Sequence, residues 1–222
     1  MVAIIQTYGS MLLGALGKTL LLTLLSLFFA MIIGLIFSLM NVGKNRLFNL
    51  IGTVYVDAVR GVPLIVLAFY IYFGVPTGIK LMGFQDFRLS ALQAGTIALS
   101  MNCGAYMAEI IRAGIESIDK GQMEASRSLG INYRLSMQTI VLPQAIRTMI
   151  PSIINQFIIT LKDTSILSVI GFPELTNTGK TIMGNTFKSL QTWTIVGIMY
   201  MVVIITLSKI AKRVERRVNR GR

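Results

Sequence analysis

Long uncharged apolar runs recur along the chain and predict its main elements. Three of these runs are clean, and they cover Thr19–Met40, Leu89–Ala108 and Ser189–Ser208. Each is about as long as an α-helix must be to cross the hydrocarbon core of a bilayer, roughly 20 residues. The pattern therefore predicts transmembrane helices at these three places.

A fourth apolar stretch, Leu50–Gly74, carries charges and a helix breaker. Asp57 and Arg60 lie within it, and Gly61-Val62-Pro63 interrupts it. Irregular backbone at membrane depth is tolerated only where protein or a watery cavity satisfies its polar groups, and charged residues there usually face a pathway. We expect a broken, pore-lining span in which Arg60, Pro63 and Asp57 act in gating. The alternative is a local i,i+3 ion pair between Asp57 and Arg60 near the membrane interface.

A fifth stretch, Arg147–Leu161, contains Pro151 and runs into Lys162-Asp163. We expect this span to be broken and pore-lining as well. The chain is thus predicted to be an all-α integral membrane protein, with a single transmembrane domain over residues 1–222. Its five predicted membrane helices cover about 17–40, 48–74, 88–110, 145–162 and 189–210.

Lysine and arginine residues concentrate on one side of these spans. Thirteen of the 21 lie in segments 41–49 and 110–138 and in the tail from Lys209, whereas five lie on the opposite side. Cytoplasmic loops carry the excess of basic residues, so we expect the N-terminus outside and the C-terminus inside. In a soluble protein a net charge of +12 would indicate nucleic-acid binding, but only 14% of residues are charged and 54% are hydrophobic. The predicted spans therefore exclude a nucleic-acid partner.

The sequence offers little for catalysis. There is no histidine and only one cysteine, Cys103, which excludes intrachain disulfides, Cys/His zinc sites and His-based triads. Residues 177–181 resemble the end of a phosphate-binding loop, but Glu174 stands where that pattern needs a glycine. We therefore expect no enzyme activity and no metal site.

Small residues stand four apart on the first predicted span, at Ala30, Gly34 and Ser38. Such a face allows another helix to approach closely. Alternatively, these residues are simply scattered along a long apolar helix.

The segment between the third and fourth spans has a helical pattern of its own. A short helix is predicted from Glu124 to Leu129, with Gly121 before it and Gly130 as its C-terminal break. Apolar residues such as Met123 and Tyr133 would be unnecessary in a purely solvated loop. The helix could lie on the inner leaflet or dock on a cytoplasmic partner, and composition alone favours the leaflet.

Several motifs carry a resemblance to a known family. Glu124-Ala125, the following Gly130 and Leu142-Pro143 resemble the EAA loop of ABC importer permeases. Three further segments narrow the resemblance to the family of polar amino acid permeases. They are Arg60-Gly61-Val62-Pro63, which is similar to the RGTP motif of that family, Ala98–Glu109 and Lys162–Gly171. Glutamine permeases are the most similar in character. Ser126 and Val62 depart from the family pattern, and both are small changes.

The resemblance implies the permease subunit of an ATP-driven importer in the bacterial inner membrane. Its implied partners are a cytoplasmic ABC ATPase dimer, an external amino-acid-binding protein or domain, and a second permease subunit, which we expect to be another copy. ATP and Mg²⁺ would bind to the ATPase, so no cofactor is expected in this chain. The resemblance also favours docking for the loop at about 120–134, with coupling residues Glu124, Ala125, Gly130, Gly121 and Ser126.

An amino acid carries a carboxylate and an ammonium that are costly to desolvate unless they are paired. Helix breaks near the membrane midplane suit this task, because helix N-termini attract carboxylates. The candidate substrate-binding residues are Gln156, Asn102, Asn155, Ser100, Thr160, Lys162 and Asp163. Alternatively, Ser100, Asn102 and Thr160 form hydrogen bonds between helices, and Lys162 and Asp163 form a structural pair.

Gln156 is the most specific of these candidates. In the family, members that handle basic amino acids commonly have an acidic residue at the fifth position after the proline that matches Pro151. The uncharged amide at Gln156 therefore predicts a polar uncharged substrate, with glutamine first and cystine or glutamate as alternatives. A channel or facilitator that works without ATP is the alternative from another class.

Overall fold

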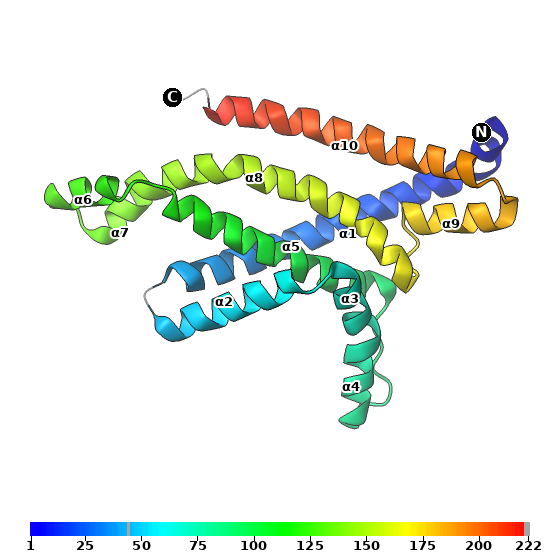
Figure 1. Ribbon diagram of the computed structural model, residues 1–222, viewed down its shortest axis with the longest axis horizontal. Coiled ribbons are helices and arrows are strands. Elements are labelled where there is room, and N and C mark those ends of the chain that lie inside the picture. The colour runs from blue at the N-terminus through cyan, green and yellow to red at the C-terminus, as the bar shows by residue number, and fades with distance from the viewer. Residues whose placement is uncertain (44, 220–222) are drawn as a thin grey trace.

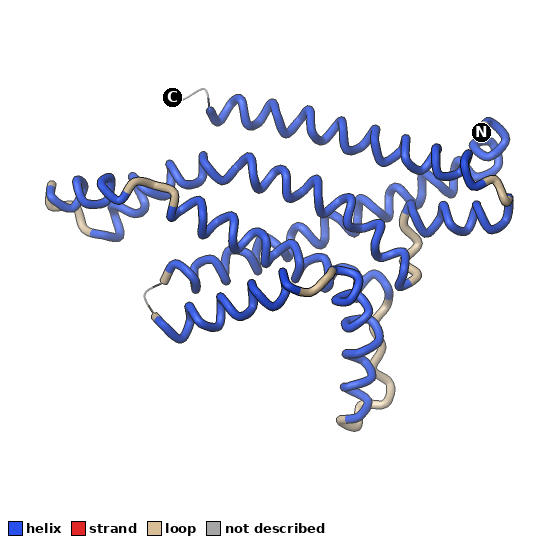
Figure 2. The backbone as a smooth tube through the Cα atoms, viewed as in Figure 1, coloured by secondary structure: helices blue, strands red, loops and turns tan. Residues whose placement is uncertain are grey.

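The computed structural model describes residues 1–43 and 45–219, and every regular element in these ranges is a helix (Figure 1, Figure 2). The α-helices are α1 (Val2–Val42), α2 (Arg46–Gly61), α3 (Leu64–Phe69), α4 (Val75–Leu81), α5 (Ala91–Glu116), α6 (Lys120–Ser128), α7 (Tyr133–Ser136), α8 (Leu142–Asp163), α9 (Leu175–Thr186) and α10 (Ser189–Asn219). One-turn π-helices at Tyr70–Gly74 and Met137–Val141 join α3 to α4 and α7 to α8, and a 3₁₀-helix at Thr164–Ile170 follows α8. The predicted all-α class is confirmed.

Four helical stretches within the described residues are long and apolar enough to cross a membrane. They are Val2–Val42, Leu64–Leu81, Tyr133–Ile170 and Ser189–Arg213. The predicted third span corresponds to α5, which is not among them, so the five-span topology and its orientation stay predictions. Lys44, Arg220 and Arg222, three of the basic residues behind that orientation, lie outside the described residues.

The centre of the molecule is α5, which contacts α1, α2 and α8 along its length. The predicted small-residue face of α1 takes part in this contact, because Ala30 packs with Cys103 and Met107 of α5. Ser38 is fully buried as well. A Cβ added to Gly34 would lie 2.5 Å from the Cβ of Met107 on α5. The glycine is therefore required by the close approach of the two helices.

Gly34→Ala should lower the melting temperature of the purified protein by about 2–12 °C, because overpacking costs about 1–3 kcal/mol and each kcal/mol shifts the melting temperature of a chain of this size by about 2–4 °C. Gly17→Ala is the matched control on the same helix, since nothing lies within 4 Å of a Cβ there. Alanine favours a helix over glycine by about 1 kcal/mol, so the control should be neutral or stabilising. Equal melting temperatures for both variants, measured by thermal unfolding in detergent, would contradict this account of the α1–α5 contact.

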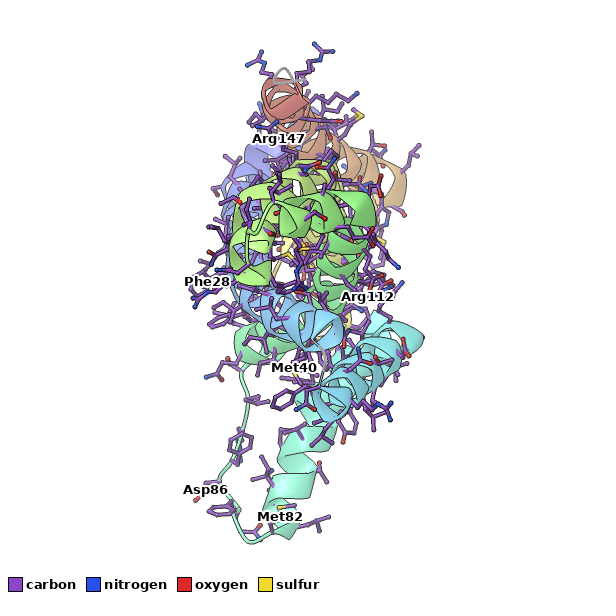
Figure 3. All side chains as sticks on the ribbon, turned by 90° about the vertical axis from the view of Figure 1, so that its left-hand side faces the viewer. Phe28, Met40, Met82, Asp86, Arg112 and Arg147 are labelled. Atoms are coloured by element: carbon purple, nitrogen blue, oxygen red, sulfur yellow. The ribbon has the colours of Figure 1, made fainter. Side chains whose placement is uncertain are left out.

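The predicted break in the second span is present. Helix α2 ends at Gly61, Val62 and Pro63 have extended backbone, and α3 begins at Leu64. After the break the chain turns away from the bundle, continues to the end of α4 at Leu81, and returns through the loop that contains Asp86 (Figure 1, Figure 3). The helix thus extends past the predicted limit at residue 74.

The expectation that the fourth span is broken at Pro151 is wrong, because α8 runs through this residue without interruption. A proline removes a single backbone hydrogen bond, and neighbouring helices tolerate this inside a bundle. The regular helix ends later, at Asp163, where the 3₁₀-helix starts with Thr164. The helix end therefore lies next to the polar residues that the sequence singled out.

At the other end of the molecule from α6, Glu174 holds α9 and α10 together. Its carboxylate is fully buried and accepts hydrogen bonds from the backbone N–H groups of Thr176 (2.7 Å) and Asn177 (2.6 Å). The hydroxyl of Tyr200 on α10 donates to the same carboxylate at 2.7 Å. Burial raises the pKa of Glu174, and these hydrogen bonds oppose the rise. This cap and cross-link explain why a glutamate, not a glycine, stands at position 174.

Candidate functional site

A polar cavity of about 490 Å³ lies between the break of the second span, α5 and α8. Its wall comes from Arg60, Gly61, Val62, Pro63 and Leu64 at the break, Asn102 and Tyr106 on α5, and Gln156, Ile159 and Asp163 on α8. The cavity therefore gathers residues from three segments that are far apart in the sequence.

The break is held against α5 by a hydrogen bond just before it. The Tyr55 hydroxyl on α2 donates to the backbone carbonyl of Met101 at 2.9 Å, next to Asn102. Because Gly61 and Pro63 stop the helix directly after this anchor, backbone of the break forms one wall of the cavity. Such irregular backbone lines a cavity, as expected for a membrane protein.

Two of the predicted substrate residues are amides that line this cavity from two different helices, α5 and α8. Asn102 is 8% exposed and Gln156 is 6% exposed, and both belong to the lining. A nearly buried amide offers a donor and an acceptor to a bound molecule. The cavity can therefore recognise a polar group without supplying a net charge.

The cavity also has one basic and one acidic side chain. Arg60 reaches it from the end of α2, with its guanidinium carbon 5.2 Å from the ring centre of Tyr106, and Asp163 reaches it from the end of α8. The described ion partner of Arg60 is Glu109 on α5, with 3.8 Å between Nη1 and Oε2. The alternative of a local Asp57–Arg60 ion pair is thus not realised. Asp57 does not line this cavity.

The remaining predicted substrate residues lie outside the lining. The hydroxyl of buried Ser100 has two backbone carbonyls as acceptors, that of Thr96 in its own helix at 2.5 Å and that of Ser26 on α1 at 3.2 Å. The second is the helix-to-helix contact left open as an alternative, and the first is the shorter. Thr160, also buried, donates to the backbone carbonyl of Gln156 at 2.9 Å. Asn155 and Lys162 are exposed. The structure shows no Lys162–Asp163 ion pair among the described residues.

On α5 and α8, two lining residues were missed from the sequence, Tyr106 and Ile159; at the break, Gly61, Val62 and Leu64 were not site candidates either. A signal for the first two exists in the helical period, because residues four apart share a helix face. Tyr106 follows Asn102 by four positions, and Ile159 lies between Gln156 and Asp163 on one face of α8. Extending each predicted polar residue along its helix would have found them.

The predicted coupling segment forms α6, which lies with α7 beyond the ends of α5 and α8 at one end of the molecule (Figure 1). The predicted start at Glu124 is wrong, and so is the position of Gly121 before the helix. Helix α6 begins at Lys120 because the side chain of Asp119 caps it, accepting from the backbone N–H of Gly121 at 2.9 Å. Gly130 has φ +82°, so the predicted glycine break after the helix is confirmed.

The two sides of α6 differ. Ser126 is buried, and its hydroxyl lies 2.5 Å from the hydroxyl of Ser136 on α7. Glu124 and Ala125 are exposed, and Leu129 is 82% exposed at the end of the helix. A small residue at 126 therefore fits the packing against α7, whereas Leu129 is left exposed at the end of the helix.

Comparisons with known proteins agree with each other. A family model described as the inner membrane component of binding-protein-dependent transport systems matches residues 26–220. The glutamine transport system permease protein GlnP of Escherichia coli (strain K12) is 36% identical over 199 residues, covering 90% of this chain and 89% of that protein. The arginine transport system permease protein ArtQ of Bacillus subtilis (strain 168) is 37% identical over 202 residues, covering 91% and 90%. In the crystal structure of an amino acid ABC transporter with histidines, one chain superposes with a TM-score of 0.88, at 37% identity and with 96% of both chains covered.

Proposed function

The chain belongs to the family of inner membrane components of binding-protein-dependent transport systems, and from this premise we propose that it imports a polar uncharged amino acid, with glutamine favoured. It is a permease subunit of an ABC importer for amino acids, and the ATPase is a separate chain. Family membership implies an ATPase and a substrate-binding protein as partners.

The substrate proposal rests on the charged side chains in the cavity lining. Its lining holds one guanidinium, from Arg60, and one carboxylate, from Asp163. An amino acid zwitterion with an uncharged side chain matches this pair: Arg60 binds the α-carboxylate with charge-assisted hydrogen bonds, and Asp163 binds the α-ammonium. A basic side chain would bring a second positive charge with no partner in the cavity. Leaving it unpaired is costly.

The two amides in the cavity then recognise the side chain of the substrate. Asn102 and Gln156 reach the cavity from α5 and α8, and a carboxamide can donate to and accept from another carboxamide. Glutamine carries such a group. Cystine and glutamate remain alternatives, and the similarity to an arginine permease makes arginine the competitor to test.

Assembly and coupling follow the family plan. We propose five membrane spans, with the N-terminus outside and the C-terminus inside the bacterial inner membrane, and a homodimer of permeases whose two α6 helices dock on two ATPase subunits. ATP and Mg²⁺ bind to that ATPase. The docking helix is shaped by Glu124, Ala125, Gly121, Ser126 and Gly130. The exposed Leu129 at its end supports a contact with a partner. Alternating access moves the substrate, with Arg60, Pro63 and Asp57 as gating residues at or near the break.

Uptake in proteoliposomes tests the proposal directly. The permease, its ATPase and its binding protein are reconstituted together, and uptake of labelled glutamine and arginine is measured with and without ATP. We expect ATP-dependent uptake of glutamine and at least about tenfold less uptake of arginine, since 1.4 kcal/mol of lost pairing gives a factor of ten. If arginine stimulates ATP hydrolysis more than glutamine does, the substrate assignment is wrong. Equal uptake without ATP would indicate a facilitator.

The Gln156→Glu variant sharpens the same experiment. It adds a negative charge to the cavity wall, so the ratio of arginine to glutamine uptake should rise about tenfold or more. Asn155→Asp is the matched control, because Asn155 lies next to Gln156 on α8 but is exposed outside the cavity. The same shift in both variants would place the effect in the general electrostatics of α8 and not in the cavity.

A further inference from the structure

A second polar cavity, of about 350 Å³, lies between α1, α2 and α5. It is lined by Asn41 on α1, by Asn49, Thr53, Val56, Asp57 and Arg60 on α2, and by Glu109, Arg112 and Glu116 on α5. Arg60 belongs to the linings of both cavities. The two cavities are therefore neighbours that meet at one guanidinium.

The second cavity lies on the α6 side of the first. Asn41 is next to the last residue of α1, Asn49 is in the first turn of α2, and Glu116 is the last residue of α5. The helix ends that these residues occupy lead toward α6, since only a short connection separates α5 from Lys120 (Figure 1). A solute that leaves the first cavity past Arg60 toward the docking helix would enter the second.

Charged side chains of α5 form a series of ion pairs in this second cavity. Arg112 donates to both carboxylate oxygens of Glu109 (3.2 and 2.5 Å) and to Glu116 (2.5 Å). Arg60 is held more loosely, at 3.8 Å from Glu109. If a substrate carboxylate replaces Glu109 as the partner of Arg60, Glu109 keeps its two hydrogen bonds to Arg112. Exchanging the partner of Arg60 therefore leaves no unpaired carboxylate.

Asn41 and Asp57 both line this cavity, but they differ in what they offer to it. The side chain of Asn41 is only 9% exposed, and its carboxamide oxygen has no hydrogen-bond partner among the described residues. This oxygen is fully covered and lies against Gly52 of α2, so it faces the neighbouring helix and is not open to the cavity. The acceptor that the cavity offers to an ammonium group is the exposed carboxylate of Asp57, which belongs to its lining.

We infer that the cavity between α1, α2 and α5 is a second binding site for the amino acid zwitterion, and that the Arg60–Glu109 pair separates it from the first. The substrate carboxylate passes from Arg60 toward Arg112, and its ammonium passes to the Asp57 carboxylate. This inference rests on the proposed function. It assigns Glu109 a positioning role, since Glu109 holds Arg60 between the two cavities.

Binding stoichiometry tests the second site. The permease with its ATPase, without the binding protein, is held in nanodiscs, and equilibrium dialysis with labelled glutamine, and separately with labelled arginine, counts molecules bound per permease chain. For whichever amino acid the wild type imports, we expect two per chain at saturation, and one per chain for Asp57→Asn, with the tighter site unchanged. One molecule per chain in the wild type overturns the second site. Import of arginine in place of glutamine overturns only the proposed substrate, because the count is still made.

A leak measurement tests the separating pair. Proteoliposomes loaded with the labelled amino acid are diluted without ATP, and its efflux is followed. Glu109→Gln should raise efflux about fivefold or more, because Arg60 loses its partner, and Glu109→Asp should restore most of the barrier. The matched control is Asp86→Asn, in an exposed loop that extends away from the bundle (Figure 3). Efflux that is unchanged in Glu109→Gln, or raised equally in the control, overturns the separating role.

Discussion

Replacing Arg60 with alanine is expected to reduce kcat/KM for uptake by about 30- to 100-fold. The guanidinium lines the substrate cavity, and its loss leaves the α-carboxylate without a charged partner. Losing a charge-assisted pair costs about 2–3 kcal/mol, where each 1.4 kcal/mol is a factor of ten. Arg60→Lys should recover part of the loss, because an ammonium keeps the charge but not the paired hydrogen bonds.

The chemical reason for this loss can be isolated with a second substrate. The α-amide of glutamine lacks the carboxylate, so wild type and Arg60→Ala should transport it at similarly low rates. Arg88→Ala is the control for removing an exposed arginine elsewhere, and it should leave uptake of both compounds unchanged. An equal fold loss for glutamine and its α-amide in Arg60→Ala would show that Arg60 does not bind the carboxylate. ATP-dependent uptake of the labelled compounds into proteoliposomes is the measurement.

The second large effect is expected at the end of the docking helix. Gly130 has φ +82°, a conformation that β-branched residues avoid. Gly130→Val should therefore move the chain after α6, with the exposed Leu129 at its end, and remove the stimulation of ATP hydrolysis by loaded binding protein. We expect stimulation to fall to basal hydrolysis, while the permease still folds.

Gly83 offers a matched control for backbone strain. It has φ +102° and lies in the loop after α4, far from α6 (Figure 1). Gly83→Val introduces the same kind of strain but should leave stimulation intact. If both variants lose stimulation to the same extent, strain acts on the fold as a whole, and the docking role of α6 loses its support. Assembly of each variant with the ATPase is checked by size-exclusion chromatography.

The elements that depend on local chemistry were predictable from the sequence. The break at Gly61–Pro63 was predictable, because proline has no N–H to continue a helix and disfavours helical backbone before it. The turn at Gly130 was predictable for a similar reason, since only glycine readily adopts a positive φ. Pro151 was misjudged by the same rule, because the bundle tolerates one lost hydrogen bond inside α8.

The assembly of the site was less predictable. Asn102 and Ser100 are two positions apart on α5, and both were candidates, but only Asn102 reaches the cavity. Residues two apart point about 200° away from each other on a helix. When a helix is apolar nearly all round, the sequence does not reveal which face meets which neighbour. Glu109, seven residues after Asn102 and on the same face, was missed as the partner of Arg60 for this reason.

By itself, the sequence determined that this chain is a helical membrane protein, where its second span breaks and which glycine ends the docking helix. These properties depend on the length of apolar runs and on the backbone chemistry of single residues. Only the tertiary structure decided that Arg60, Asn102, Gln156 and Asp163 share one cavity and that Arg60 faces Glu109. Such proximity depends on how helices rotate and pack against each other. Those choices follow from contacts between residues far apart in the sequence, and no local pattern records them.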